Sequence, residues 1–173
     1  MLSDTHGHVY AVEAILNWAQ DLSQSGGINA AVFLGDGVSD LMRGVNAGDR
    51  SFEWKMVQGN NDFEYSLPQS DVLDFNGFRF FLCHGHRYAL HDGFYALAGA
   101  ARNMKAETAL FGHTHIPCNK KHNNILLINP GSVGRPRSRS GPTFAVIECL
   151  PRETLIVEFW GIDTKGKIKK IKL

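Results

Sequence analysis

The sequence has few cysteines, no long apolar segment and almost no excess charge. Its three cysteines, Cys83, Cys118 and Cys149, are scattered and odd in number, which argues against a disulfide framework. They favour a reducing compartment, so we expect a cytoplasmic protein. The apolar runs are too short to cross a bilayer, and Asp4 and His6 interrupt any signal-peptide pattern, so we expect no membrane association. A formal net charge of +1 gives no electrostatic argument for a nucleic-acid partner.

The order of predicted elements changes along the chain. We expect a helix at 9–22, strands at 30–34 and 54–57, a hairpin centred on Asn76-Gly77, a helix at 91–105 with Asp92 as its N-cap, and a strand at 108–111. The last third contains only short strand-like runs separated by polar turns, which predicts a β-meander. This pattern is typical of an α/β fold, and 173 residues suit one domain spanning 1–173.

Five short polar motifs each follow an apolar run, at the point where a strand would end. They are D-T-H at 4–6, G-D at 35–36, G-N-N-D at 59–62, H-G-H at 84–86 and G-H-T-H at 112–115. Each motif alone is weak, because Asp, Asn and Gly are common turn residues. Ligands of open α/β sheets bind beyond the carboxyl ends of the strands, so the five motifs together predict one site. Imidazole and carboxylate without thiolate favour divalent ions such as Mn, Fe, Zn, Co or Ni.

The ordered set resembles the signature of the calcineurin-like metallophosphoesterases: D-x-H, G-D-x-x-D, G-N-[HCN]-[DE], H and G-H-x-H. The motif NPGSV at 129–133 and the short chain resemble the small bacterial YfcE-type phosphodiesterases. The resemblance implies a four-layer α/β/β/α sandwich, in which two mixed β-sheets are flanked by helices. It also implies a small-molecule phosphate ester as substrate, and homodimers are common among such relatives.

The resemblance further implies a site for two divalent metal ions, with manganese first and Fe, Zn, Ni, Co or Mg as alternatives. Its residues would be Asp4, His6 and His115 for one ion, Asn60, His84 and His113 for the other, and Asp36 as a bridge between both. Two such ions carry more positive charge than two carboxylates cancel, which favours a phosphoryl group. A water that bridges them loses its proton near neutral pH and can attack the phosphorus in line.

One motif departs from the signature at a catalytic position. Relatives that act on monoesters or nucleic acids often carry a His where this chain has Asn61, and that His protonates the leaving group. An amide is a poor acid, and acid catalysis contributes roughly 10²–10⁴-fold, so we expect a preference for diesters with good leaving groups. His86 and His8 are alternative acids, and each also has an ordinary structural interpretation. Asp62 either orients the Asn60 loop or forms a simple Asx turn.

Other polar residues near the motifs have less specific interpretations. Asp40 comes one residue late for the second Asp of the signature, so we expect it to cap a helix or support the site rather than bind metal. Residues 129–142 are rich in Gly, Pro and Arg, which predicts an exposed loop. For Arg135, Arg137 and Arg139 we favour contact with solvent over contact with a substrate phosphate.

Two other functions compete with a phosphodiesterase. A relative in the eukaryotic retromer uses the same fold as a protein-binding scaffold with a degraded site, whereas all the ligand positions are intact here. A phosphomonoesterase or nuclease would favour His at position 61, and a repair nuclease would also need a capping domain and a basic groove. We therefore favour the phosphodiesterase.

The segment before the first motif is short. Only Met1, Leu2 and Ser3 precede Asp4, whereas a central strand usually has about five or six residues. We expect either that further apolar residues precede Met1 or that a short first strand leaves a looser metal site around Asp4.

Overall fold

The computed structural model describes residues 1–24, 27–46, 53–150 and 154–173. The elements are α1 (Val9–Gln24), β1 (Ala30–Phe33), α2 (Val38–Asn46), β2 (Glu53–Met56), β3 (Ser70–Phe75), β4 (Phe78–Cys83), the 3₁₀ turn η1 (Leu90–Asp92), α3 (Tyr95–Asn103), β5 (Thr108–Leu110), β6 (Cys118–His122), β7 (Ile125–Asn129), β8 (Thr143–Leu150), β9 (Thr154–Ile162) and β10 (Ile168–Ile171). No helix in the described ranges is long and apolar enough to cross a membrane.

The strands form two layers. One is a five-stranded mixed sheet in the order β3-β4-β5-β7-β6. The other consists of the parallel pair β1-β2 and the antiparallel sheet β8-β9-β10. Residues 1–4 lie between β1 and β8 and connect these two parts by backbone hydrogen bonds. Met1 exchanges backbone hydrogen bonds with Ala145, and Leu2 bonds to Val32 and Leu34. The N-terminal segment is thus a very short strand that forms a single β-bridge, between Leu2 and Phe33.

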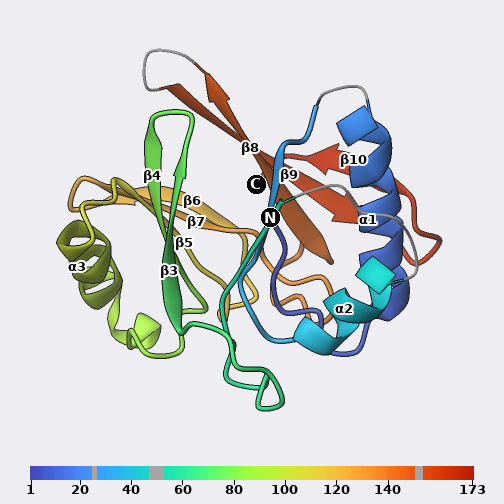
Figure 1. Cartoon of the computed structure of the whole chain (residues 1–173), viewed down its shortest axis with the longest axis horizontal. Helices are drawn as coiled ribbons and strands as arrows, with labels where there is room; N and C mark the ends of the chain where they lie inside the picture. The colour runs from blue at the N-terminus through green and yellow to red at the C-terminus, as the bar shows by residue number, and fades with distance from the viewer. Residues whose placement is uncertain (25–26, 47–52, 151–153) are drawn as a thin grey trace.

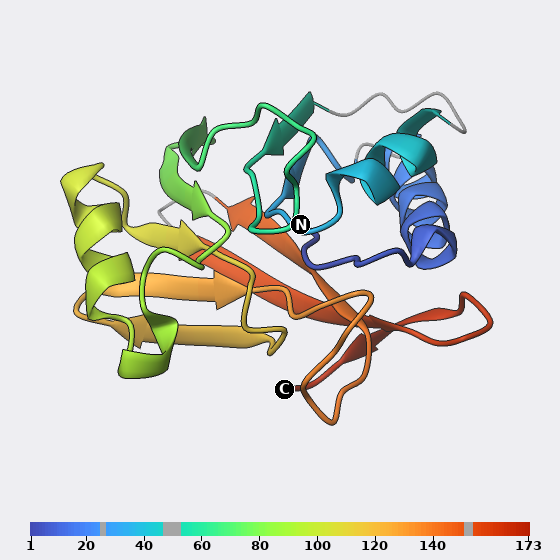
Figure 2. The ribbon, with the colours of Figure 1, turned by 90° about the horizontal axis from the view of Figure 1, so that it is seen from below.

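Helices cover the outer faces of the two layers (Figures 1 and 2), with α1 and α2 on one side and α3 on the other. Alternate side chains of a strand point to opposite faces, which explains how one strand serves two cores. In β4, Phe80 and Leu82 pack between the sheets, whereas Phe81 and Cys83 pack in the cluster that includes α3. A separate cluster holds α1 and α2 against the layer formed by β1, β2 and β8 to β10. The predicted α/β/β/α sandwich is confirmed.

Two local predictions were wrong, and one helix was missed. Asp92 does not cap the helix predicted at 91–105. That helix is α3, which begins only at Tyr95, and Gly93 at φ 114° separates it from η1. The helix α2 was not predicted. The late strands do not form one meander, since β6 and β7 join the sheet of β4 and β5 while β8 to β10 extend the other layer.

Candidate metal centre

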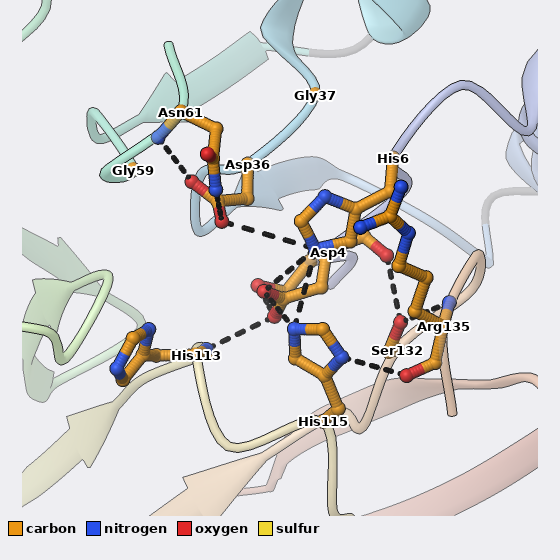
Figure 3. Close-up of polar contacts among 12 residues, drawn as sticks. Asp4, His6, Asp36, Gly37, Gly59, Asn61, His113, His115, Ser132 and Arg135 are labelled. Atoms are coloured by element: carbon orange, nitrogen blue, oxygen red, sulfur yellow. Dashed lines mark hydrogen bonds and ion pairs between the residues drawn. The ribbon is translucent and has the colours of Figure 1, made fainter. Parts of the chain in front are cut away.

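The five motifs converge at the carboxyl ends of the strands, on tight turns. Five of the expected metal ligands have positive φ angles, between 43° and 66°: Asp4, His6, Asp36, His113 and His115. Such left-handed conformations cost residues other than glycine of order 1 kcal/mol or more, and they cluster at functional sites. Figure 3 shows Asp4, His6, Asp36 and His115 gathered around one point.

Asp4 is fully buried and uses its two carboxylate oxygens differently. Its Oδ2 accepts hydrogen bonds from the Ser3 hydroxyl at 2.6 Å and from the backbone N–H of His113 at 3.0 Å. Its Oδ1 has no hydrogen-bond donor and faces Nε2 of His115 at 3.1 Å and Nε2 of His6 at 3.8 Å. A buried anionic oxygen without a donor is costly unless a cation lies beside it.

The tautomers of two histidines follow from their backbone contacts. Nδ1 of His115 lies 2.6 Å from the carbonyl oxygen of Arg135, and Nδ1 of His84 lies 2.6 Å from that of Leu34. A carbonyl can only accept, so in each ring Nδ1 carries the proton. The neutral rings therefore present the lone pair of Nε2 to the site. For His115 that lone pair meets the anionic Oδ1 of Asp4, so a proton or a metal cation must lie between them.

The same arrangement recurs around His84. Its Nε2 lies 3.1 Å from Oδ1 of Asn60 and 3.5 Å from Oδ2 of Asp36, and all three atoms are acceptors when the ring is neutral. Asp36 is held by Asn61, whose backbone N–H donates to Oδ1 at 2.8 Å and whose side-chain amide donates to Oδ2 at 2.5 Å. The Gly of the G-N-N-D motif is required here, because a Cβ on Gly59 would lie 2.1 Å from Oδ1 of Asp36.

The ligand atoms fall into two groups that share one residue. Those of Asp4, His6 and His115 lie within 4.8 Å of one another, and so do those of Asp4, Asp36 and His84. Asp4 rather than Asp36 is thus the common member, although Oδ2 of Asp36 also lies 3.8 Å from Nε2 of His6.

His113 joins neither group. Its ring centroid lies 5.2 Å from that of His84, and its ring points away from Asp4 and His115 (Figure 3). In the structure its backbone N–H, rather than its imidazole, contacts the carboxylate of Asp4.

The charges of the group shift several pKa values. Burial alone would raise the pKa of Asp36, but the hydrogen bond and charge of His84 and the donors of Asn61 hold it well below its usual range. Burial alone would lower the pKa of His84, but Asp36 and Asp4 raise it. The pKa of His115 is raised chiefly by the carboxylate of Asp4 beside its Nε2. The metal-free protein therefore favours protons on His84 and His115, and a metal bound by these two rings would release them.

Asp62 ties the loops after β1 and β2 together. Its buried carboxylate accepts four backbone N–H groups at 2.7–2.9 Å: those of Asp36, Gly37, Val38 and Gly59. Both carboxylate oxygens of Asp62 are therefore engaged by backbone donors and are not available to a substrate or a metal. Of the two predicted roles, orienting the loop that carries Asn60 is the one this geometry supports.

Asp40 supports the first motif. It lies in the first turn of α2, and its Oδ2 accepts the hydroxyl of Thr5 at 2.6 Å and the N–H of Gly7 at 2.7 Å. It therefore fixes the turn that carries His6.

The loop at 129–142 is only half exposed, contrary to prediction. Residues 129–133 are buried because they pack against the N-terminal segment and the start of β8. The hydroxyl of Ser132 donates to the backbone oxygen of Asp4 at 2.7 Å and accepts the N–H of Arg135 at 2.8 Å. Sequence reasoning missed Ser132 and Ser3 as supports, although the NPGSV motif contained the first of them.

A cleft of about 420 Å³ opens over the site. Its lining residues are His6, Asp36, Asn60, Asn61, His113, His115, Arg135, Pro136 and Arg137. Arg139 does not line the cleft, so the three arginines differ in position.

The two alternative general acids, His86 and His8, are poorly placed to protonate a leaving group in the cleft. His86 and His8 are absent from the lining of this cleft. The ring centroid of His86 lies 5.5 Å from that of His84, and its buried Nδ1 has no hydrogen-bond partner. Burial and the neighbouring His84 lower the pKa of His86, which weakens it as an acid at neutral pH. His8 is exposed at the start of α1.

The model of the calcineurin-like phosphoesterase superfamily domain matches residues 1–151. The chain belongs to this superfamily. Among its relatives, a Bacillus subtilis protein named "Probable metallophosphoesterase YsnB" is 27% identical over 129 residues, covering 70% of this chain and 75% of the relative. The phosphodiesterase YfcE of Escherichia coli K12 is 25% identical over 167 residues, 84% of each chain.

Solved structures agree with this assignment. A Streptococcus pneumoniae protein described as a predicted phosphoesterase superposes with a TM-score of 0.74 at 26% identity, covering 98% of this chain and 94% of that one. Vps29 from Entamoeba histolytica, solved with zinc, superposes with a TM-score of 0.70 at 20% identity, covering 99% and 96% of the two chains, which shows the fold alone. The predicted family is confirmed.

Proposed function

We propose that this chain is a two-metal phosphodiesterase that acts on small phosphate esters in the cytoplasm. The observation that carries the proposal is the pair of acceptor-to-acceptor contacts, His115 with Asp4 and His84 with Asp36. Each places an imidazole Nε2 against a carboxylate oxygen, so a proton or a cation must lie between the two atoms, and a divalent cation fits this position. The three free cysteines support a reducing compartment.

Two ions account for the two groups of ligand atoms. Asp4, His6 and His115 would hold one ion, and Asn60 and His84 would hold the other, with His113 completing that set after a change of its side-chain rotamer. Asp36 would be shared by both sets, since its Oδ2 lies 3.5 Å from Nε2 of His84 and 3.8 Å from Nε2 of His6. Manganese is the first candidate, since mixed imidazole and carboxylate sites suit it and its neighbours in the series. When bound, two such ions supply positive charge for the phosphoryl oxygens and activate water as the nucleophile.

The chain's own residues then select the ester. Arg135 and Arg137 line the cleft together with Asn60 and Asn61, and their positive charge favours an anionic phosphate there. Asn61 stays bound to Asp36 and offers an amide, not an acid, to the leaving group. A diester whose leaving group needs no protonation is therefore the substrate that fits.

A protein-binding scaffold is the alternative, since Vps29 shares the fold. Zinc in the Entamoeba histolytica Vps29 structure shows that metal binding alone does not separate the two functions. Turnover does. The intact ligand set and the cleft above it favour the enzyme.

The test is hydrolysis of bis-p-nitrophenyl phosphate with Mn²⁺ by the whole chain. We expect EDTA to abolish turnover and Asp36→Asn to lower kcat/KM by at least about 100-fold, because the carboxylate lies among the metal ligands. The matched control is Asp92→Asn, an exposed carboxylate in η1, which should leave kcat/KM unchanged. Absence of metal-dependent turnover, with Mn²⁺ binding intact, would instead support the scaffold.

A further inference from the structure

Two arginines on the loop after β7 lie in the metal cleft without a carboxylate partner. Arg135 and Arg137 line the cleft, and Asp36 is the only acidic residue among the described residues that line it. Neither guanidinium group makes a hydrogen bond or an ion pair with another described residue. Figure 3 shows the side chain of Arg135 extending from its loop towards His6. Both positive charges are therefore available to a ligand in the cleft.

The charges of these arginines reach the expected metal ligands. Burial lowers the pKa of His6, and the charge of Arg135 contributes to the decrease. Asp4 raises the pKa of His115, and the charge of Arg137 opposes that rise. Metal ions held by the same ligands would add further positive charge beside the arginines. Cations gathered in this way repel one another unless anions lie among them.

The backbone of this loop is bonded to the residues around the site. The N–H of Arg135 donates to Oγ of Ser132 at 2.8 Å, and its C=O accepts the N–H of Nδ1 of His115 at 2.6 Å. The N–H of Arg137 donates to the C=O of His115 at 3.0 Å. None of these bonds uses an arginine side chain, so the guanidinium groups extend from a backbone that is fixed before a ligand binds. Such preorganisation lowers the entropic cost of binding.

The positive charge of the occupied site would exceed the charge of a simple phosphodiester. Asp4 and Asp36 cancel only half of the charge of two divalent ions, and Arg135 and Arg137 add as much positive charge as these carboxylates cancel. A phosphodiester carries a single negative charge. A terminal phosphate group adds about 1.5 to 2 negative charges near neutral pH. Its oxygens can accept hydrogen bonds from two guanidinium groups, whereas a carboxylate is matched by one.

We propose that Arg135 and Arg137 form a subsite for a second phosphate group of the substrate, beside the phosphoryl group that is hydrolysed. The inference rests on the proposed phosphodiesterase activity and narrows its substrate class to diesters that carry a further phosphate. The arginines bind and orient that second phosphate. Arg139 lies on the same loop but does not line the cleft, so it takes no part in the subsite.

Two esters that differ by one phosphate test the subsite. One is the p-nitrophenyl diester of thymidine monophosphate, and the other carries a second phosphate on its remaining sugar hydroxyl, so both release p-nitrophenol. With Mn²⁺ we expect the second ester to have a kcat/KM at least about tenfold higher in the wild type and in the matched control Arg139→Met. In the double variant Arg135→Met/Arg137→Met this ratio should fall below about two. The ratio is taken within each protein, so a general loss of activity does not enter it.

Binding of inorganic phosphate separates the subsite from the activity. The metal-free proteins are titrated with phosphate in the presence of EDTA and followed by phosphorus NMR. The double variant should bind phosphate at least about tenfold more weakly than the wild type and Arg139→Met. Equal binding by all three proteins would overturn the subsite, whether or not the esters are hydrolysed. Hydrolysis of both esters at an unchanged ratio in the double variant would also overturn it and leave the phosphodiesterase intact. Absence of turnover, with phosphate binding that depends on the two arginines, would support the subsite and refute the activity.

Discussion

The substitution Asp62→Asn tests whether the loops beneath the metal centre depend on one carboxylate. Oδ1 of Asp62 accepts the N–H groups of Gly37 and Val38, and Oδ2 accepts those of Asp36 and Gly59. Asparagine keeps one oxygen and turns an NH₂ group toward two of the four donors, which loses two charge-assisted bonds. At about 1.5–3 kcal/mol each, the free energy of unfolding should fall by about 3–6 kcal/mol.

Thermal unfolding of the metal-free protein measures this loss. For a chain of this size each kcal/mol corresponds to about 2–4 °C, so the melting temperature should fall by roughly 10 °C. The matched control is Asp74→Asn, whose ion pair with Arg79 is largely exposed and should change stability by less than about 1 kcal/mol. A melting temperature for Asp62→Asn within about 2 °C of the wild type would refute the reasoning, because the four bonds would then carry little of the loop structure.

Two further predictions concern protons at the site. The raised pKa values of His84 and His115 mean that the metal-free fold is stabilised by bound protons at low pH and loses this stabilisation as pH rises through those values, above about 6.5. The increase in melting temperature caused by Mn²⁺ should therefore be larger at pH 8 than at pH 6, and an equal increase at both would contradict the assignment of these rings as ligands. Asn61→His should raise kcat on alkyl phosphate monoesters at least about tenfold while changing bis-p-nitrophenyl phosphate turnover little; unchanged monoester turnover would show that the leaving group obtains its proton elsewhere.

The sequence predicted the residues of the site better than the elements that support it. The paired histidines and the aspartates of the five motifs were visible because they follow apolar runs, a local pattern. The four N–H groups around Asp62 come from two different loops, and the contact of Ser132 with Asp4 joins residues 128 positions apart. Such contacts depend on the packing of distant segments, which no local pattern encodes.

The pairing of the late strands shows the same limit. The segments of β6 to β10 were recognisable as short strand-like runs, but the sheet that each joins depends on partners far along the chain. The chain from 129 to 133 looked like an exposed loop by composition, and burial against residues 3–5 overrode that expectation. By contrast the turn at Asn76-Gly77 needed only local chemistry, and β3 and β4 pair around it as predicted.

The left-handed turns at five of the expected ligands have an evolutionary consequence. Each holds an Asp or a His in a backbone conformation that Gly or Asn adopts more easily, so the site is less stable than the same loops without function. A lineage that stopped needing the metals could change these positions one by one, and many of the changes would raise stability. Substitutions that remove the metal ligands would then increase the free energy of unfolding. A stable non-catalytic descendant is therefore an expected product of relaxed selection on this fold.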